Sequence, residues 1–213
     1  MPESFVEYDS FIHHEMLAHP ALFTHQKTAH VAIIQSQQDG VAVEVLKHSG
    51  VEQVWQISPT QPVTHSADPR LRYFVGSDAE WRNQCPSQSQ DVIILPEKTA
   101  AISSKIFADY FNLLRDDGIL IQQGESFFVP EDLKSIYQML QQAGFNDMQL
   151  LHFPQPNFPS GWRAAIMAIK KGTFKQVREK DVFNKSFVTR YYNFDVHKAA
   201  LVMPEFMRNE LAV

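Results

Sequence analysis

The sequence predicts an α/β protein, a three-layer fold built on a mostly parallel sheet. Short apolar runs alternate with amphipathic segments, and residues 29–58 have the strand–helix–strand spacing of one βαβ unit. The composition shows no break along the 213 residues, which favours a single domain over 1–213. Within it we expect an amino-terminal segment at 1–28, a sheet core at 29–170 and a carboxy-terminal helical block at 171–213.

The first half of the chain has the patterns of two helices and four strands. We expect an amphipathic opening helix or turn from Glu7 to His19 that ends before Pro20, because proline removes a helical hydrogen bond. A second helix is expected at Val41–His48, and the Pro-, Ser- and Thr-rich segment Ser58–Pro69 is typical of a loop. The strands, each a run rich in β-branched or aromatic residues, are expected at Val31–Ile34, Val51–Ile57, Leu71–Val75 and Asp91–Leu95.

The second half continues the alternation. Ser103–Arg115 has apolar residues at helical spacing, and Asp116–Gly118 has the composition of a tight turn before the strand Ile119–Ile121. Pro130–Ala143 is expected to be a helix, because proline suits the first turn and Gly144 suits the position after the last. Two later strands are expected at Met148–Phe153 and Ala164–Ile169.

Charge and cysteine content exclude several classes of function. The net charge of −5 gives no basic face for nucleic acid. The single cysteine, Cys85, excludes an internal disulfide framework and is typical of a reducing compartment. There is no apolar run of about 20 residues to span a membrane and no signal-peptide pattern. We therefore expect a cytoplasmic protein that binds neither nucleic acid nor membrane.

The turn after the first expected strand departs from the usual chemistry of such units. In a βαβ unit this turn usually carries glycines, so that backbone amides can approach an anionic or nucleoside ligand. Here residues 35–40 read Gln-Ser-Gln-Gln-Asp-Gly, with one glycine. Side chains stand where bare backbone is normally needed, which raises the question of whether the chain is an enzyme.

Three blocks resemble the polyamine aminopropyltransferases, the spermidine and spermine synthases. They are Tyr8–Leu22, Val45–Val54, and Arg190–Ala200 followed by Pro204–Phe206. The resemblance implies a Rossmann-like, methyltransferase-type sheet whose last strand is antiparallel. It also implies transfer of an aminopropyl group from decarboxylated S-adenosylmethionine to an amine, with that donor as a co-substrate and no other cofactor.

At the positions that the resemblance implies for donor binding, this chain differs from the family pattern. The glycine-rich nucleoside loop of the family aligns with residues 35–40, where only the final glycine matches and the aspartate lies one place away. The ribose-binding acid aligns with a serine, and the Gly-Asp pair after the third strand has a serine inserted. The positions implied for donor binding are Gln38, Asp39, Gly40, Ser58, Ser77 and Asp78.

The catalytic aspartate of the family aligns with Pro96, which has no ionisable side chain. Glu97 is the next residue and is a candidate replacement, although the simpler interpretation is half of a solvated pair with Lys98. On the acceptor side Gln123 matches the family residue, whereas other tyrosine positions are changed. The positions implied for substrate binding are His13, His14, Gln123, Glu125 and Phe158. Gln123 and Glu125 are alternatively interpreted as parts of a hydrogen-bonded loop.

Two further patterns have ordinary interpretations. His14 and His19 flank a glutamate as in zinc proteases, but the second histidine comes one residue late, about 140° around a helix from the first. We therefore predict no metal site. Tyr191, Tyr192 and His197 are expected to pack as an aromatic cluster.

Three functional hypotheses follow. The first is a spermidine-synthase-like pseudoenzyme, inactive or very weak, whose ligand is a polyamine or a nucleoside. The second is a reshaped aminopropyltransferase that uses Glu97 or Asp39. The third is a non-catalytic subunit that associates with an active synthase. In the family a β-hairpin domain precedes the block that resembles Tyr8–Leu22. We expect this domain to be missing here, and therefore expect exposed apolar surface and a homodimer.

Overall fold

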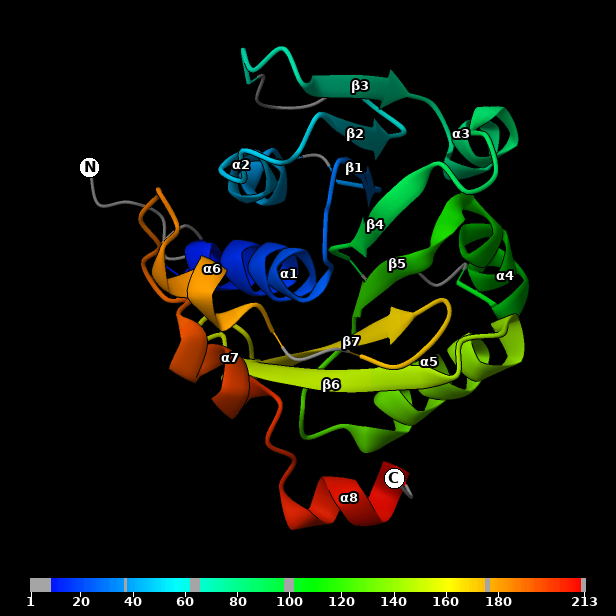
Figure 1. The fold of residues 1–213 in the computed structure, drawn as a ribbon. Helices are drawn as coiled ribbons and strands as arrows, with labels where there is room; N and C mark the ends of the chain where they lie inside the picture. Colours follow the sequence, from blue (N-terminus) through cyan, green and yellow to red (C-terminus); the bar gives the residue numbers. More distant parts are fainter. Residues whose placement is uncertain (1–8, 37, 62–65, 98–101, 175–176, 212–213) are drawn as a thin grey trace.

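A single sheet forms the centre of the protein, seen edge-on in the computed structural model in Figure 1. The structure describes residues 9–36, 38–61, 66–97, 102–174 and 177–211. The seven strands of the sheet are β1 (His30–Ile34), β2 (Gln53–Ser58), β3 (Leu71–Val75), β4 (Gln90–Leu95), β5 (Leu114–Gln123), β6 (Asp147–Pro154) and β7 (Trp162–Ile169).

The strand order is β3-β2-β1-β4-β5-β7-β6. The first five strands in this order pair in parallel, and β7 is antiparallel to both of its neighbours, β5 and β6. The predicted mostly parallel sheet with an antiparallel last strand is therefore confirmed.

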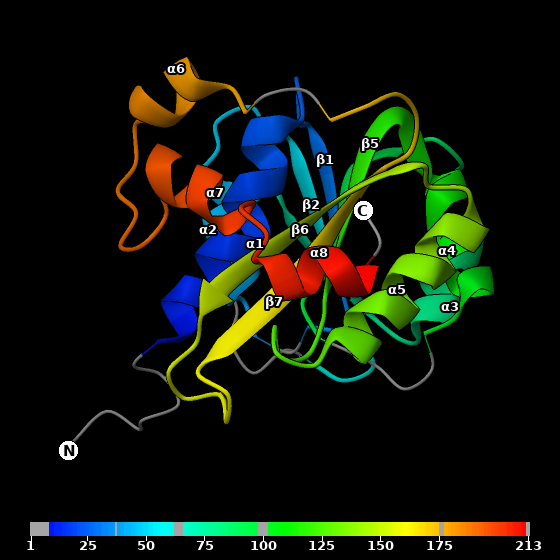
Figure 2. The same ribbon diagram turned by 90° about the horizontal axis from the view of Figure 1, so that it is seen from below.

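Helices cover both faces of the sheet, which makes three layers (Figure 1). The helices α1, α2, α6 and α7 lie on one face, and α3, α4 and α5 lie on the other. The short α8 lies beside β6 and contacts α5, as Figure 2 shows from below. The bounds are α1 Ser10–Thr24, α2 Gly40–Leu46, α3 Asp78–Gln84, α4 Ser104–Leu113, α5 Pro130–Ala143, α6 Glu179–Phe183, α7 Phe194–Ala200 and α8 Glu205–Leu211.

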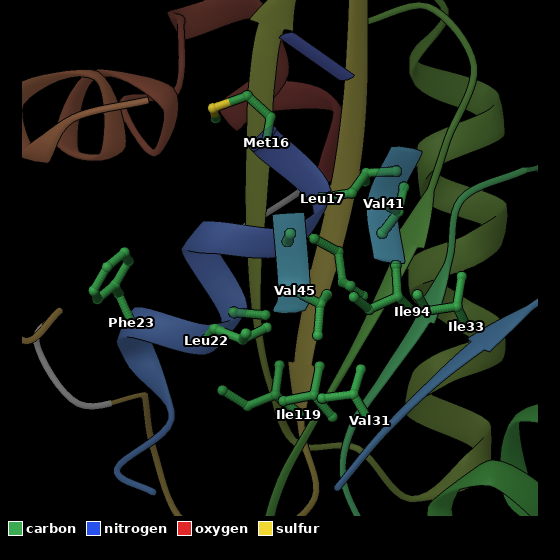
Figure 3. Close-up of a cluster of buried hydrophobic side chains, with 14 of the residues drawn as sticks. Met16, Leu17, Leu22, Phe23, Val31, Ile33, Val41, Val45, Ile94 and Ile119 are labelled. Atoms are coloured by element: carbon green, nitrogen blue, oxygen red, sulfur yellow. The ribbon is translucent and has the colours of Figure 1, made fainter. Parts of the chain in front are cut away.

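Two apolar cores lie on the two faces of the sheet. Successive strand residues point to opposite faces, so Ile33 packs toward α1 and α2 whereas Ala32 packs toward α4 and α5. Figure 3 shows the first core, where Leu17 of α1 and Val45 of α2 meet Ile94 of β4. Burial on both faces explains why the strands read as nearly continuous apolar runs.

The opening helix differs from the prediction. The prediction that it ends before Pro20 is wrong, because α1 continues through Pro20 to Thr24. Ala21 and Leu22, which follow the proline, are almost fully buried, and this burial offsets the lost backbone hydrogen bond. Glu7 and Tyr8 lie outside the described residues.

Two other elements also differ. The residues Asp116–Gly118, predicted as a turn, belong to β5, which begins at Leu114 and has a register shift against β4 between Gln90 and Val92. The helix α3 was not predicted, although Ser77 and Glu80 form a capping box at its start. Both differences lie at the ends of strands, where loops and bulges determine the local backbone.

Candidate functional site

The implied site residues gather at the carboxyl ends of the parallel strands. The chain leaves β1 toward β2 on one side, while β4 pairs on the other side of β1. Open α/β sheets bind ligands at such a switch point, beyond the carboxyl ends of the strands. Residues 35–39 follow β1, Pro96 and Glu97 follow β4, and residues 123–125 lie at the end of β5.

Side chains hold the turn after β1 in place. Gln35 has a left-handed backbone with φ of 58°, which is uncommon for a residue other than glycine. The Ser36 hydroxyl donates to the carbonyl of Gln38 at 2.8 Å, and the Gln56 amide donates to the carbonyl of Ser36 at 3.1 Å. The turn is thus supported by side-chain contacts to its carbonyls, and Gln37 lies outside the described residues.

Two polar residues of the implied donor side, Asp39 before α2 and Ser58 at the end of β2, are buried. Asp39 accepts a hydrogen bond from the Tyr73 hydroxyl at 3.0 Å. Burial, with the nearby Asp39 carboxylate, raises the pKa of Tyr73 and keeps the phenol protonated as a donor. Ser58 is 1% exposed, and its hydroxyl accepts from the backbone of Thr60 at 3.4 Å. Asp39, just before α2, and Ser58, the last residue of β2, are therefore part of the buried structure.

Gly40 is needed for a close approach between two helices. A Cβ atom at Gly40, the first residue of α2, would overlap the imidazole of His14 on α1. Burial lowers the pKa of His14, so this ring is predominantly neutral at pH 7. The one glycine of the turn, Gly40, therefore leaves room for the side chain of His14.

A smaller cavity of about 250 Å³ lies near the start of α3. Ser77 caps this helix, and the Asp78 carboxylate accepts from Arg82 at 2.9 Å and from the Tyr110 hydroxyl at 2.8 Å. Asp78 is thus held by two protein groups within the cavity wall. The described residues around the cavity are Ile34, Gln35, Ser77, Asp78, Ala79, Arg82, Leu95, Glu97, Ile102, Ile106 and Tyr110.

A larger cavity of about 630 Å³ brings together all five positions implied for substrate binding. Among the described residues of its wall are three carboxylates, those of Asp9, Glu97 and Glu125, and one guanidinium, that of Arg163. The remaining described lining residues are Ser10, His13, His14, Gln38, Pro96, Gln123, Gln155, Asn157 and Phe158.

Gln123 is the centre of the contacts within this cavity. With its amide nitrogen directed toward the Pro96 carbonyl and His13 Nε2, its oxygen accepts from Arg163. Burial, together with the neighbouring His14, lowers the pKa of His13 to about 4, so the ring is neutral and can accept this hydrogen bond. Gln123 therefore joins α1, the end of β4 and β7.

Asp9 and Arg163 are lining residues that sequence reasoning missed. Asp9 is buried and accepts from the Asn157 backbone at 2.7 Å and from the Asn157 side chain at 3.1 Å. The Arg163 guanidinium carbon lies 4.0 Å above the centre of the Phe158 ring. Neither residue has a sequence signal of its own, because the fold brings them into the cavity from distant segments.

Pro96 and Glu97 lie between the two cavities. Pro96 is buried and lines the larger cavity, whereas Glu97 is exposed and lines both. The carbonyl of Glu97 also accepts from the Gln122 amide at 3.4 Å. Glu97 is therefore the described carboxylate that reaches both halves of the site.

The two histidines of the sequence pattern have different partners. His14 lies against Gly40 at the start of α2, whereas His19 contacts Glu44, further along α2, and His48, at 3.0 and 2.9 Å. Among the described residues, no group of three His, Cys, Asp or Glu side chains is placed to hold a metal ion. The helices within the described part of the chain are also too short or too polar to cross a membrane.

Comparison with known proteins identifies the family. Residues 10–181 match the spermine/spermidine synthase domain. The chain is 38% identical to the polyamine aminopropyltransferase of Nitrosococcus oceani, over 94% of this chain and 76% of that protein. It is 35% identical to that of Halorhodospira halophila, over 95% of this chain and 80% of that protein.

A solved structure gives the same result. Spermidine synthase from Thermotoga maritima superposes with a TM-score of 0.87 and 26% identity, over 97% of this chain and 76% of that structure. The methyltransferase-type arrangement implied by the three sequence blocks is thereby confirmed. The chain belongs to the spermidine and spermine synthase family, the polyamine aminopropyltransferases.

Proposed function

We propose that this protein binds a small amine in the larger cavity and transfers aminopropyl groups weakly or not at all. One observation carries the proposal. The described part of the amine cavity contains three carboxylates, whereas Asp39 and Asp78, at the positions implied for donor binding, accept hydrogen bonds from tyrosine hydroxyls. Carboxylates around a cavity favour a cationic ligand.

The chemistry of the reaction supports the second half of the proposal. In aminopropyl transfer, an amine lone pair forms a bond to the carbon beside the sulfonium, the carbon–sulfur bond breaks, and methylthioadenosine leaves. The amine starts largely as an ammonium ion and must first lose a proton, for which a positioned base typically supplies about 10²–10⁴-fold in rate. Pro96 offers no base at the position after β4.

Calorimetry and a product assay test the proposal. We expect saturable binding of at least one of n-butylamine, putrescine and spermidine. We expect no isotherm for decarboxylated S-adenosylmethionine or methylthioadenosine with a dissociation constant below about 10 μM, equivalent to about −7 kcal/mol. Release of methylthioadenosine at a rate typical of the family, or failure of all three amines to bind, would contradict the proposal.

A reshaped, active aminopropyltransferase is the second candidate, and the position of Glu97 favours it. This carboxylate lines both cavities and could accept the amine proton between them. The test is turnover of the donor with putrescine or spermidine before and after Glu97→Gln. Glu131→Gln, an exposed change at the start of α5, is the matched control. Turnover that is lost in the first variant and kept in the second would establish this candidate.

A further inference from the structure

Arg163 places a cation of the protein itself inside the amine cavity. The residue lies near the start of β7, is half-buried, and stacks on Phe158 with 4.0 Å between the guanidinium carbon and the ring centre. Its Nη1 also donates to the side-chain oxygen of Gln123. Gln123 and Phe158 are two of the positions at which the family resemblance places contacts with the substrate amine.

The charges around Arg163 hold it there. Burial lowers the pKa of Arg163, whereas the carboxylates of Glu125, Asp9 and Glu97 favour its charged form. A guanidinium still remains protonated in proteins at neutral pH, unlike an amine, so this positive charge is permanent. His13 and His14 add no charge, because burial lowers the pKa of both. The described wall therefore combines three carboxylates with one fixed cation.

From this geometry we propose that Arg163 determines which amines the cavity accepts. It takes the place of one ammonium group of a diamine, so that the cavity selects an amine with one positive charge over diamines and polyamines. The proposal rests on the amine binding proposed above. Like charges a few ångströms apart in a partly desolvated site repel strongly, and the guanidinium cannot relieve that repulsion by losing its proton.

The stacking contact explains why the side chain would not simply move aside for a diamine. Leaving the cavity would break the contact with the Phe158 ring and the hydrogen bond to Gln123 together. It would also separate the guanidinium from the carboxylate of Glu125, which favours its charged form. The second ammonium group of a diamine must therefore compete with the Arg163 guanidinium, which already contacts Phe158 and Gln123.

Calorimetric titration with n-butylamine and putrescine, which have the same carbon chain, tests the proposal at constant ionic strength. We expect the unaltered protein to bind butylamine at least as tightly as putrescine. In Arg163→Met, putrescine affinity should rise by about tenfold or more while butylamine affinity changes much less, since only putrescine carries the second charge. Arg163→Lys keeps the charge and should retain the original preference.

The control is Arg72→Met, which removes an exposed arginine on β3 and should change neither affinity. Should Arg163→Met fail to fold, Arg163→Gln removes the charge and keeps a polar partner for Gln123. An unchanged ratio of putrescine to butylamine affinity in a folded, uncharged variant would overturn the inference and leave the proposed function intact. Absence of binding by any amine to any variant would overturn both.

Discussion

Neighbouring residues of α1 meet very different surroundings. In the middle of the helix, the buried carboxylate of Glu15 accepts from the backbone N–H groups of Arg190, Tyr191 and Tyr192, at 2.8, 2.9 and 2.7 Å. Nearer its start, His13 and His14 meet the turns of the site, where one glycine remains and a proline follows β4. The first region joins the helix to the carboxy-terminal block, and the second faces the cavity.

The comparison teaches that the polar groups that hold the scaffold together are distinct from those that would carry out chemistry. Glu15 is needed wherever the carboxy-terminal block docks on α1, whatever the protein binds. Pro96 and Ser58 matter only for what enters the site. Identity measured along the whole chain therefore reports mainly on the scaffold, and the site must be tested residue by residue.

The largest expected effect comes from removing the scaffold carboxylate. Glu15→Ala leaves three N–H groups without their acceptor, that of the buried Tyr192 and those of Tyr191 and Arg190, which are less buried, and an unpaired buried donor costs about 1–3 kcal/mol. We expect the free energy of unfolding to fall by at least about 2 kcal/mol, measured by urea denaturation. Glu52→Ala, at an exposed position before β2, should change it by less than about 0.5 kcal/mol. A loss below about 1 kcal/mol in Glu15→Ala would break the comparison.

The second prediction concerns pH. Burial lowers the pKa of His48 to about 3 and the pKa values of His13 and His197 to about 4. In the unfolded chain these rings titrate near pH 6.5, so below that pH the unfolded state binds protons that the folded state does not. The free energy of unfolding should therefore fall by at least about 2 kcal/mol between pH 7 and pH 5.

Urea midpoints at the two pH values measure this loss, and His197→Gln should make the pH dependence shallower. His197 is 1% exposed and contacts the Tyr192 hydroxyl at 2.8 Å, so it reports on the scaffold region. Equal stability at pH 7 and pH 5 would show that these histidines are accessible to protons in the folded state.

A smaller effect is expected where the two regions meet. In Gly40→Ala the new methyl group overlaps the His14 ring, which is partly buried and must move. We therefore expect the free energy of unfolding to fall by about 1–2 kcal/mol and the amine affinity to change. Gly50→Ala is the control, because its methyl would lie 3.6 Å from the nearest atom, the carbonyl oxygen of Thr28. His14→Ala combined with Gly40→Ala should recover the stability lost to the overlap. No recovery would show that the overlap is not the cause.

The fold could be predicted further than the site. The strands follow from local runs such as Val31–Ile34, whose burial on both faces requires apolar residues at every position. The end of α1 could not be predicted, because burial of Ala21 and Leu22 offsets the proline only once the sheet is in place. Gln123 was singled out through the resemblance. Arg163 was not, because its entry into the cavity depends on β7 lying next to β5.

The smallest expected effect is also the sharpest test of the site. Pro96→Asp restores a carboxylate at the position after β4, yet we expect no measurable release of methylthioadenosine with putrescine or spermidine. The new acid supplies a base only, while the turn after β1 keeps the side chains of Gln35 and Ser36, and Ser58 offers no carboxylate for the ribose hydroxyls. General-base catalysis raises the rate only of a donor that is bound and oriented. Turnover by Pro96→Asp under the same assay would mean that the donor side is intact and that a single residue separates this chain from an active synthase.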